Sequence, residues 1–191
     1  MDLGLKDATA VVVGGGRGMG LAAARCLADD CARVALVGRT ADVLDKAAED
    51  LADRGSPDAL GLVADTTDAA AVNAVGPGSP GTFDDLTDEQ WRQAFDDGVM
   101  GMVHCVRSAL PLLRKAHWAR IVNSSAHSTQ RQTVMLPAYT AAIDKHFGHP
   151  AHMPRAGLPD EIGPVVAFLA SRRNSYMTGA NVNVDGGSDF T

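Results

Sequence analysis

The chain has 191 residues, of which 46% are hydrophobic and 21% charged, a composition typical of one globular domain with a sizeable core. Its net charge of −6 and the lack of a basic run argue against nucleic acid and anionic membrane surfaces as partners. The three cysteines form no CxxC pair, and the N-terminus shows no apolar leader. We therefore expect residues 1–191 to form a single, reduced, cytoplasmic domain.

Strand and helix patterns alternate along the chain. In order they are a strand at Ala8–Val13, a helix beginning near Met19, a strand at Arg33–Val37, a helix at Ala41–Arg54, a strand at Ala59–Ala64, a helix from the capping box Thr87–Gln90 to about Lys115, a strand at Arg120–Ser125, a helix at Asp160–Ser171 and a strand at Asn181–Val184. This alternation predicts a parallel sheet with helices on both faces.

The stretch VGGGRGMG joins the first predicted strand to the first predicted helix. Backbone N–H groups and the helix dipole favour a phosphate at such a place, and glycines let a pyrophosphate approach the backbone. The candidate dinucleotide-binding residues are Gly14, Gly16, Arg17, Gly18, Met19 and Gly20. A tight turn alone would also need glycine, and the spacing differs from GxGxxG, but the strand-turn-helix context favours nucleotide binding.

The second predicted strand is followed by Gly38 and Arg39, at the position where dinucleotide-binding folds place an acid for the ribose 2′-hydroxyl. An arginine there favours a 2′-phosphate instead, and Arg17 in the glycine turn is a second cation within reach. The alternative is that both are ordinary surface arginines. We expect NADP as the cofactor, in preference to NAD.

Together these residues resemble the short-chain dehydrogenase/reductase family over nearly the whole chain. Gly14, Gly18 and Gly20 match its glycine motif, and Asp65 in ADTTD matches the acid that contacts the adenine. RIVNSS followed by Tyr139 matches the region of the active-site serine and tyrosine, and RAGLPDEIGPVVAFLAS matches a late helix. The resemblance implies an α/β fold, a Rossmann-like doubly wound parallel sheet in three α/β/α layers.

The resemblance also implies an oxidoreductase that transfers a hydride between NADP(H) and a small-molecule carbonyl or secondary alcohol. Ser125 would hold the substrate oxygen, with Ser124 and Ser128 as competing candidates, and Tyr139 would exchange its proton. A tyrosine pKa of about 10 is too high for this work near neutrality, so the family places a lysine one helical turn away.

That lysine is missing, because its position is occupied by Ile143. Lys145 does not replace it, since a helical residue six positions after Tyr139 lies about 120° around the helix from it. The asparagine that usually helps to hold a proton-relay water falls on Gly98. The catalytic set that the resemblance implies is therefore incomplete.

Chain length offers an explanation, because the fold is expected to be incomplete too. Only eight residues separate Ala64 from Asn73 in NAVG, whereas a crossover between parallel strands needs about a dozen or more. The residues after Ala142 likewise show neither a helical nor a strand period. We expect two absent internal segments, and interpret them as residues that the full protein has and these 191 omit.

The rival interpretation is a shortened, non-catalytic relative that binds a nucleotide or a protein. Loss of the lysine and the asparagine together fits it, whereas the unpaired backbone of a sheet with a gap argues against it. An intact mass of 19.9 kDa from 191 contiguous codons would exclude the first interpretation.

A metal site is not expected, although His146, His149 and His152 recur at every third position. Pro150 and Pro154 prevent a helix there, and no carboxylate or cysteine completes a ligand set. The long helix after Thr87, by contrast, is apolar on more than one face. One face should cover the sheet, and the excess favours burial against a second copy, as in the homodimers and homotetramers common in the family.

Overall fold

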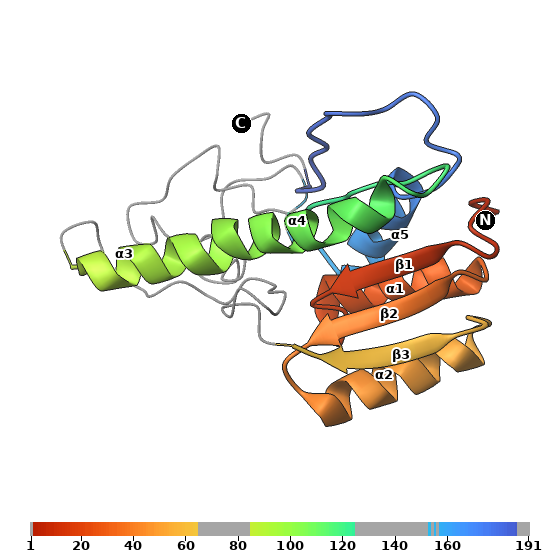
Figure 1. The fold of residues 1–191 in the computed structure, drawn as a ribbon, viewed down its shortest axis with the longest axis horizontal. Helices are drawn as coiled ribbons and strands as arrows, with labels where there is room; N and C mark the ends of the chain where they lie inside the picture. Colours follow the sequence, from red (N-terminus) through yellow and green to blue (C-terminus); the bar gives the residue numbers. More distant parts are fainter. Residues whose placement is uncertain (1, 65–84, 125–152, 154, 156, 187–191) are drawn as a thin grey trace.

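The computed structural model describes residues 2–64, 85–124, 153, 155 and 157–186. Its elements are β1 (Thr9–Val13), α1 (Gly18–Asp29), β2 (Arg33–Gly38), α2 (Ala41–Asp53), β3 (Ala59–Val63), α3 (Asp88–Phe95), the π-helix η1 (Asp96–Met100), α4 (Gly101–Leu113) and α5 (Pro159–Leu169). Figure 1 shows the three strands side by side with α1 and α2 along one face. The expected parallel α/β fold is confirmed.

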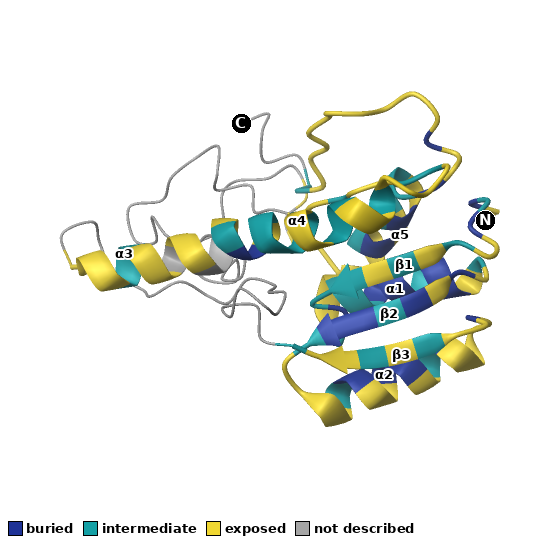
Figure 2. Cartoon of the chain, in the orientation of Figure 1, coloured by how far each residue is buried: buried dark blue, intermediate teal, exposed yellow. Residues whose placement is uncertain are grey.

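The sheet has the order β1-β2-β3, and both neighbouring pairs are parallel. Val34 and Leu36 of the central strand are 1% and 0% exposed, whereas Val11 of β1 and Val63 of β3 are 64% and 62% exposed. Figure 2 shows the same contrast between β2 and the strands on either side of it. The connections from β1 to α1 and from β2 to α2 are short, so they lie together at one end of the sheet, beside the well-buried central strand.

The core fills the space between this sheet and its helices. Its buried members are Leu3, Leu5, Ala24, Leu27, Ala28, Ala32, Val34, Leu36, Leu44, Ala47, Leu51 and Ala167. Burying one leucine or valine side chain contributes about 1.5–3 kcal/mol to folding. The small residues of α1 also allow α5 to pack closely against it, which fixes the helix that follows the glycine turn.

The long helix begins as the sequence predicts. The Thr87 hydroxyl accepts the N–H of Gln90, and the Gln90 side chain accepts the N–H of Thr87, which is the expected capping box. The helix continues through η1 to Leu113. Among the described elements α4 contacts η1 but no strand, so the prediction that one face of this helix covers the sheet is wrong for the described part.

Two predicted strands are absent. Residues 120–124 and 181–184 are described and form no strand, and Ser125, at the end of the first prediction, lies outside the described residues. A strand needs a neighbour for its backbone groups, and β1 has a partner strand on only one side in the described sheet. Among the described residues the sheet ends at β1, so neither apolar run joins a ladder there.

Candidate functional site

The glycine turn leaves the sheet at the end of β1. The Gly14 N–H donates to the carbonyl oxygen of Val37 over 2.8 Å, which extends the ladder between β1 and β2 by one residue. Gly14 and Gly18 then adopt φ angles of 74° and 58°. Glycine accepts this left-handed conformation without the steric cost that a side chain brings. Both residues are therefore needed for the path of the turn.

Other glycines of the turn are needed because of close packing. A methyl group on Gly20 would collide with the carbonyl oxygen of Gly14, so the first turn of α1 lies directly against the start of the glycine turn. A methyl group on buried Gly15 would lie 2.6 Å from Cδ2 of Leu36. The sequence did not single out Gly15, because nothing local indicates which glycine of three faces the sheet.

The N-terminus of α1 is open to an anion. Arg17 occupies the N-cap in an extended conformation without a capping side-chain hydrogen bond, and the first turn holds no acidic residue. The first intrahelical bond runs from the Leu21 N–H to the Arg17 carbonyl over 3.3 Å. The N–H groups before Leu21 therefore have no acceptor in the helix, and with the helix dipole they can hold a phosphate.

Two guanidiniums flank this end of the sheet. Arg17 lies at the N-cap and Arg39 directly follows β2, and both are exposed, as is Met19 at 46%. Within residues 2–64 and the other described ranges neither arginine makes an ion pair. Arg25, by contrast, contacts Asp50 at 2.7 Å. As far as the described residues go, the charges of Arg17 and Arg39 are thus available to a ligand.

The position of the family's asparagine lies in an irregular stretch of helix. Gly98 is the central residue of the π-helix η1, between α3 and α4. Such widened turns are rare and occur frequently at functional sites. The sequence predicted a regular helix here, since a single π turn leaves no periodic signal.

The other candidate residues fall within 65–84 and 125–152. Ser125, Tyr139 and Asp65 lie outside the described residues, as do Ile143 and Lys145. The structure brings the candidate residues of the glycine turn and Arg39 to the same end of the sheet.

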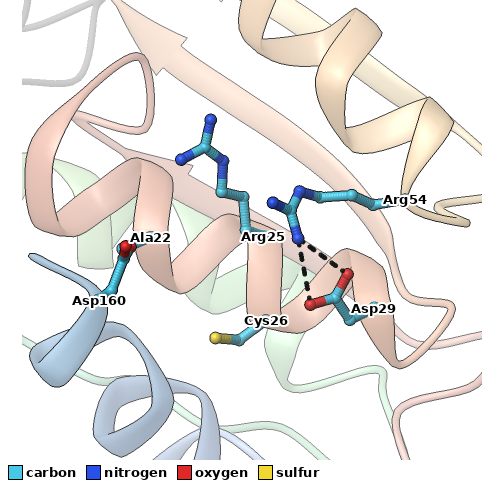
Figure 3. A pocket seen from close by; sticks show the side chains of 6 residues that line it. All are labelled: Ala22, Arg25, Cys26, Asp29, Arg54 and Asp160. Atoms are coloured by element: carbon cyan, nitrogen blue, oxygen red, sulfur yellow. Dashed lines mark hydrogen bonds and ion pairs between the residues drawn. The ribbon is translucent and has the colours of Figure 1, made fainter.

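A shallow depression of about 210 Å³ lies between α1, α5 and the end of α2 (Figure 3). It is lined by Ala22, Arg25, Cys26, Asp29, Arg54 and Asp160. Arg54 Nη1 donates to Asp29 over 3.2 Å, and burial raises the pKa of the Cys26 thiol. Paired charges and a protonated thiol do not suit catalysis, so this depression is not the candidate site.

Where side chains are described, no group of three histidine, cysteine or acidic residues could hold a metal ion. The three histidines at positions 146, 149 and 152 lie outside that part. None of the described helices combines the length and the apolar character that crossing a membrane requires.

A family model described as short chain dehydrogenase matches residues 8–76 and 70–149, and one described as enoyl-(acyl carrier protein) reductase matches residues 140–189. The chain belongs to the short-chain dehydrogenase family. Adjacent matches overlap at residues 70–76 and 140–149. These overlaps fall at the two places where the sequence indicates that a segment of the short-chain dehydrogenase fold is absent.

A related short-chain dehydrogenase is the NADP-dependent (R)-specific alcohol dehydrogenase of Lentilactobacillus kefiri. It is 26% identical over 247 residues, which cover 96% of this chain and 97% of the relative. Because this chain has 191 residues against 247 aligned positions, at least 56 of those positions have no counterpart in it. Since the alignment covers nearly all of both proteins, the positions without a counterpart lie inside the chain and not at its ends.

Solved structures share the short-chain dehydrogenase fold. L-sorbose reductase from Gluconobacter frateurii, complexed with NADPH and L-sorbose, is 23% identical with a TM-score of 0.88, and all of both chains is covered. An NADH-dependent reductase complexed with NAD is 22% identical with a TM-score of 0.84, covering 98% of this chain and 99% of that one. The function class of this chain is oxidoreductase, as in its named relatives.

Proposed function

We propose that residues 1–191 belong to one cytoplasmic domain that transfers a hydride between NADP(H) and a carbonyl or secondary alcohol carbon. The observation that carries the proposal is the open N-terminus of α1, whose free N–H groups lie next to the exposed Arg17. A pyrophosphate fits this end by hydrogen bonding and by charge. NADP(H), when bound, would supply or accept the hydride.

The preference for NADP(H) rests on Arg17 and Arg39. A 2′-phosphate carries charge that NAD lacks, and guanidiniums bind phosphate through charge-assisted, often bidentate, hydrogen bonds. Neither arginine has a carboxylate partner in the described part of the chain, so binding breaks no ion pair there. The NADP-dependent relative supports this preference, and NAD is the alternative cofactor.

The chemistry proposed for the substrate uses residues beyond the described ranges. Ser125 would hold the substrate oxygen, Tyr139 would donate or accept its proton, and Asp65 would contact the adenine. A positive charge is still needed to lower the pKa of the tyrosine. We propose that the lysine belongs to a segment that the full protein has after Ala142.

The first test is the intact mass of the protein purified from its own gene. The proposal expects a mass above the 19.9 kDa of these 191 residues. The second is NADPH oxidation with a panel of ketones and ketoses, in which Tyr139→Phe should abolish turnover while NADPH still binds. Turnover that survives Tyr139→Phe would overturn the role of the tyrosine.

The described part of the sheet ends at β1, which favours a second candidate, a shortened relative that binds a dinucleotide without catalysis. Residues 120–124, which lead to Ser125, are held by no strand ladder in the described part of the chain. Catalysis needs its groups positioned within about 0.5 Å. A 19.9 kDa protein that binds NADPH and oxidises none of it would favour this candidate.

Self-association through the long helix remains a proposal. Phe95, Met102 and Leu112 are 55%, 39% and 70% exposed. A homodimer or homotetramer would remove such side chains from water. Light scattering after size exclusion tests this, and a monomer at all concentrations would overturn it.

A further inference from the structure

Leu44 of α2 is 2% exposed and lies against three glycines from three different segments. A methyl group on Gly16 would lie 3.4 Å from Cδ2 of Leu44, and one on Gly38 would lie 3.3 Å from the same atom. A methyl group on Gly61 would lie 2.8 Å from the Leu44 Cβ. We call Gly16, Gly38 and Gly61 the glycine socket. A methyl group on Gly61 would force Leu44 to shift, one on Gly38 would press on it, and one on Gly16 would reach van der Waals contact with it.

Two glycines of the socket each precede a guanidinium of the candidate cofactor site. Arg17 follows Gly16 in the turn before α1, and Arg39 follows Gly38 at the end of β2. The two glycines that precede the arginines thus face the same methyl group of Leu44, and a methyl group on Gly16 would also lie 3.0 Å from Cγ1 of Val43. Leu44, together with its neighbour Val43, therefore helps to set the separation of the two backbones.

The third glycine of the socket fixes the leucine from the sheet. Gly61 lies in β3, where it pairs in register with Leu36 of β2. Its absent side chain lets α2 approach so closely that an added methyl group would also lie 3.2 Å from the Leu44 carbonyl carbon. A buried side chain held by backbone in this way has little freedom to move.

We infer that Leu44 is a positioning residue for the 2′-phosphate of NADP(H). The inference rests on the proposed function, in which Arg17 and Arg39 bind that phosphate. Leu44 is buried and acts through Gly16 and Gly38, whose neighbours carry the charge. Hydrogen bonds to phosphate depend steeply on donor distance and angle. A shift of the backbone at Gly16 or Gly38 therefore weakens the binding of the phosphate by Arg17 or Arg39. NADH, which lacks the 2′-phosphate, is affected less.

The experiment compares NADPH and NADH dissociation constants, by fluorescence titration, for substitutions in α2. Leu44→Ala empties the socket and Leu44→Met keeps its volume. Leu51→Ala is the matched control, since Leu51 is 0% exposed and lies two turns further along the same helix. Leu44→Ala should weaken NADPH binding by about tenfold and NADH binding by less than about threefold. Leu51→Ala should leave the ratio of the two constants unchanged.

Substitution of the socket itself tests the same coupling without removing the leucine. Gly38→Ala presses on Cδ2 of Leu44, and it should change the ratio in the same direction as Leu44→Ala. If Leu44→Ala does not fold, the ratio in Gly38→Ala decides, and Leu44→Met, which keeps the volume, should leave the ratio at the wild-type value.

Each outcome has one meaning. Equal ratios in the Leu44, Gly38 and Leu51 variants would overturn the inference and leave the proposed function standing. A wild-type protein that binds neither dinucleotide would overturn the proposed function, and the inference with it. A changed ratio confined to the Leu44 and Gly38 variants supports the inference.

Discussion

Gly163 of α5 faces Ala22 of α1 so closely that a methyl group on Gly163 would lie 2.7 Å from the carbonyl carbon and 2.8 Å from the carbonyl oxygen of Ala22. These are backbone atoms of a helix, which cannot turn aside as a flexible side chain can. The two helices are therefore held at a distance that only glycine permits, and α1 carries the N-terminus at which the dinucleotide is expected to bind.

Gly163→Ala should destabilise the protein by about 1–3 kcal/mol, since overpacking outweighs the better helix propensity of alanine. Gly157→Ala is the control, because a methyl group there meets only Cδ1 of Ile162, at 4.0 Å. Its effect should stay within about 0.5 kcal/mol. Urea unfolding measures both, and equal midpoints for the two variants would contradict the close packing of α5 on α1.

Cys31→Gly should stabilise the protein by about 0.5–1 kcal/mol. Cys31 has a φ of 60°, and its N–H donates to the Ala28 carbonyl over 2.9 Å where α1 ends. This left-handed conformation costs a side chain about 1 kcal/mol or more and costs glycine little. Cys26→Gly, inside the same helix, should destabilise by about 1 kcal/mol. Thermal unfolding in reducing buffer checks the opposite signs.

Stability should depend on pH through Glu161. Both carboxylate oxygens accept bonds of 2.7 Å from Arg155, and one also accepts the Leu158 N–H over 2.8 Å. Arg155 first, and then the Leu158 N–H, lower the pKa of Glu161 from 4.5 to about 2. Its stabilising contribution is therefore complete above about pH 4.5 and is lost as the pH falls towards 2.

Glu161→Gln should accordingly lower the melting temperature most at pH 5 and above, and the difference from wild type should shrink between pH 4.5 and 2. Asp160→Asn, at an exposed acid in the same first turn, serves as the comparison. A gap between wild type and Glu161→Gln that stays constant down to pH 2 would argue against the ion pair with Arg155.

Arg39→Ala should weaken NADPH binding by about 10- to 100-fold, because a charge-assisted contact to phosphate is worth about 1.5–3 kcal/mol. NADH binding should change by less than about threefold, and the NADPH effect should diminish at high salt. Arg33→Ala, at an exposed arginine at the start of β2, is the control. Calorimetric titration measures each constant. An equal loss of affinity for NADPH and NADH in Arg39→Ala would contradict the proposal that Arg39 binds the 2′-phosphate.

The first part of the fold could be predicted closely from the sequence. The five elements from β1 to β3 occur where apolar runs, helical spacing and glycine indicated them. Each of these signals is local, and each element packs against its neighbour in the chain. The start of α3 at Thr87 could be predicted equally well, because a capping box is defined within four consecutive residues.

What could not be predicted depends on partners distant in sequence. The run at 120–124 has the composition of a strand, but a strand also needs a neighbour, and the described sheet ends at β1. The contact of Leu44 with Gly16, Gly38 and Gly61 joins three segments that no sequence period links. The close approach of Gly163 to Ala22 depends on how α5 crosses α1. The sequence of neither helix alone predicts this crossing.

The side of β1 that faces no strand in the described part of the chain has a consequence for handling the protein. In the described sheet this strand presents backbone N–H and C=O groups with no strand opposite, and its Val11 side chain is exposed. Such an edge is a template on which another extended chain can add by intermolecular β-pairing. Aggregation that rises with concentration is therefore the expected failure of the 191-residue chain on refolding, and a charged residue at position 11 is the substitution that should suppress it.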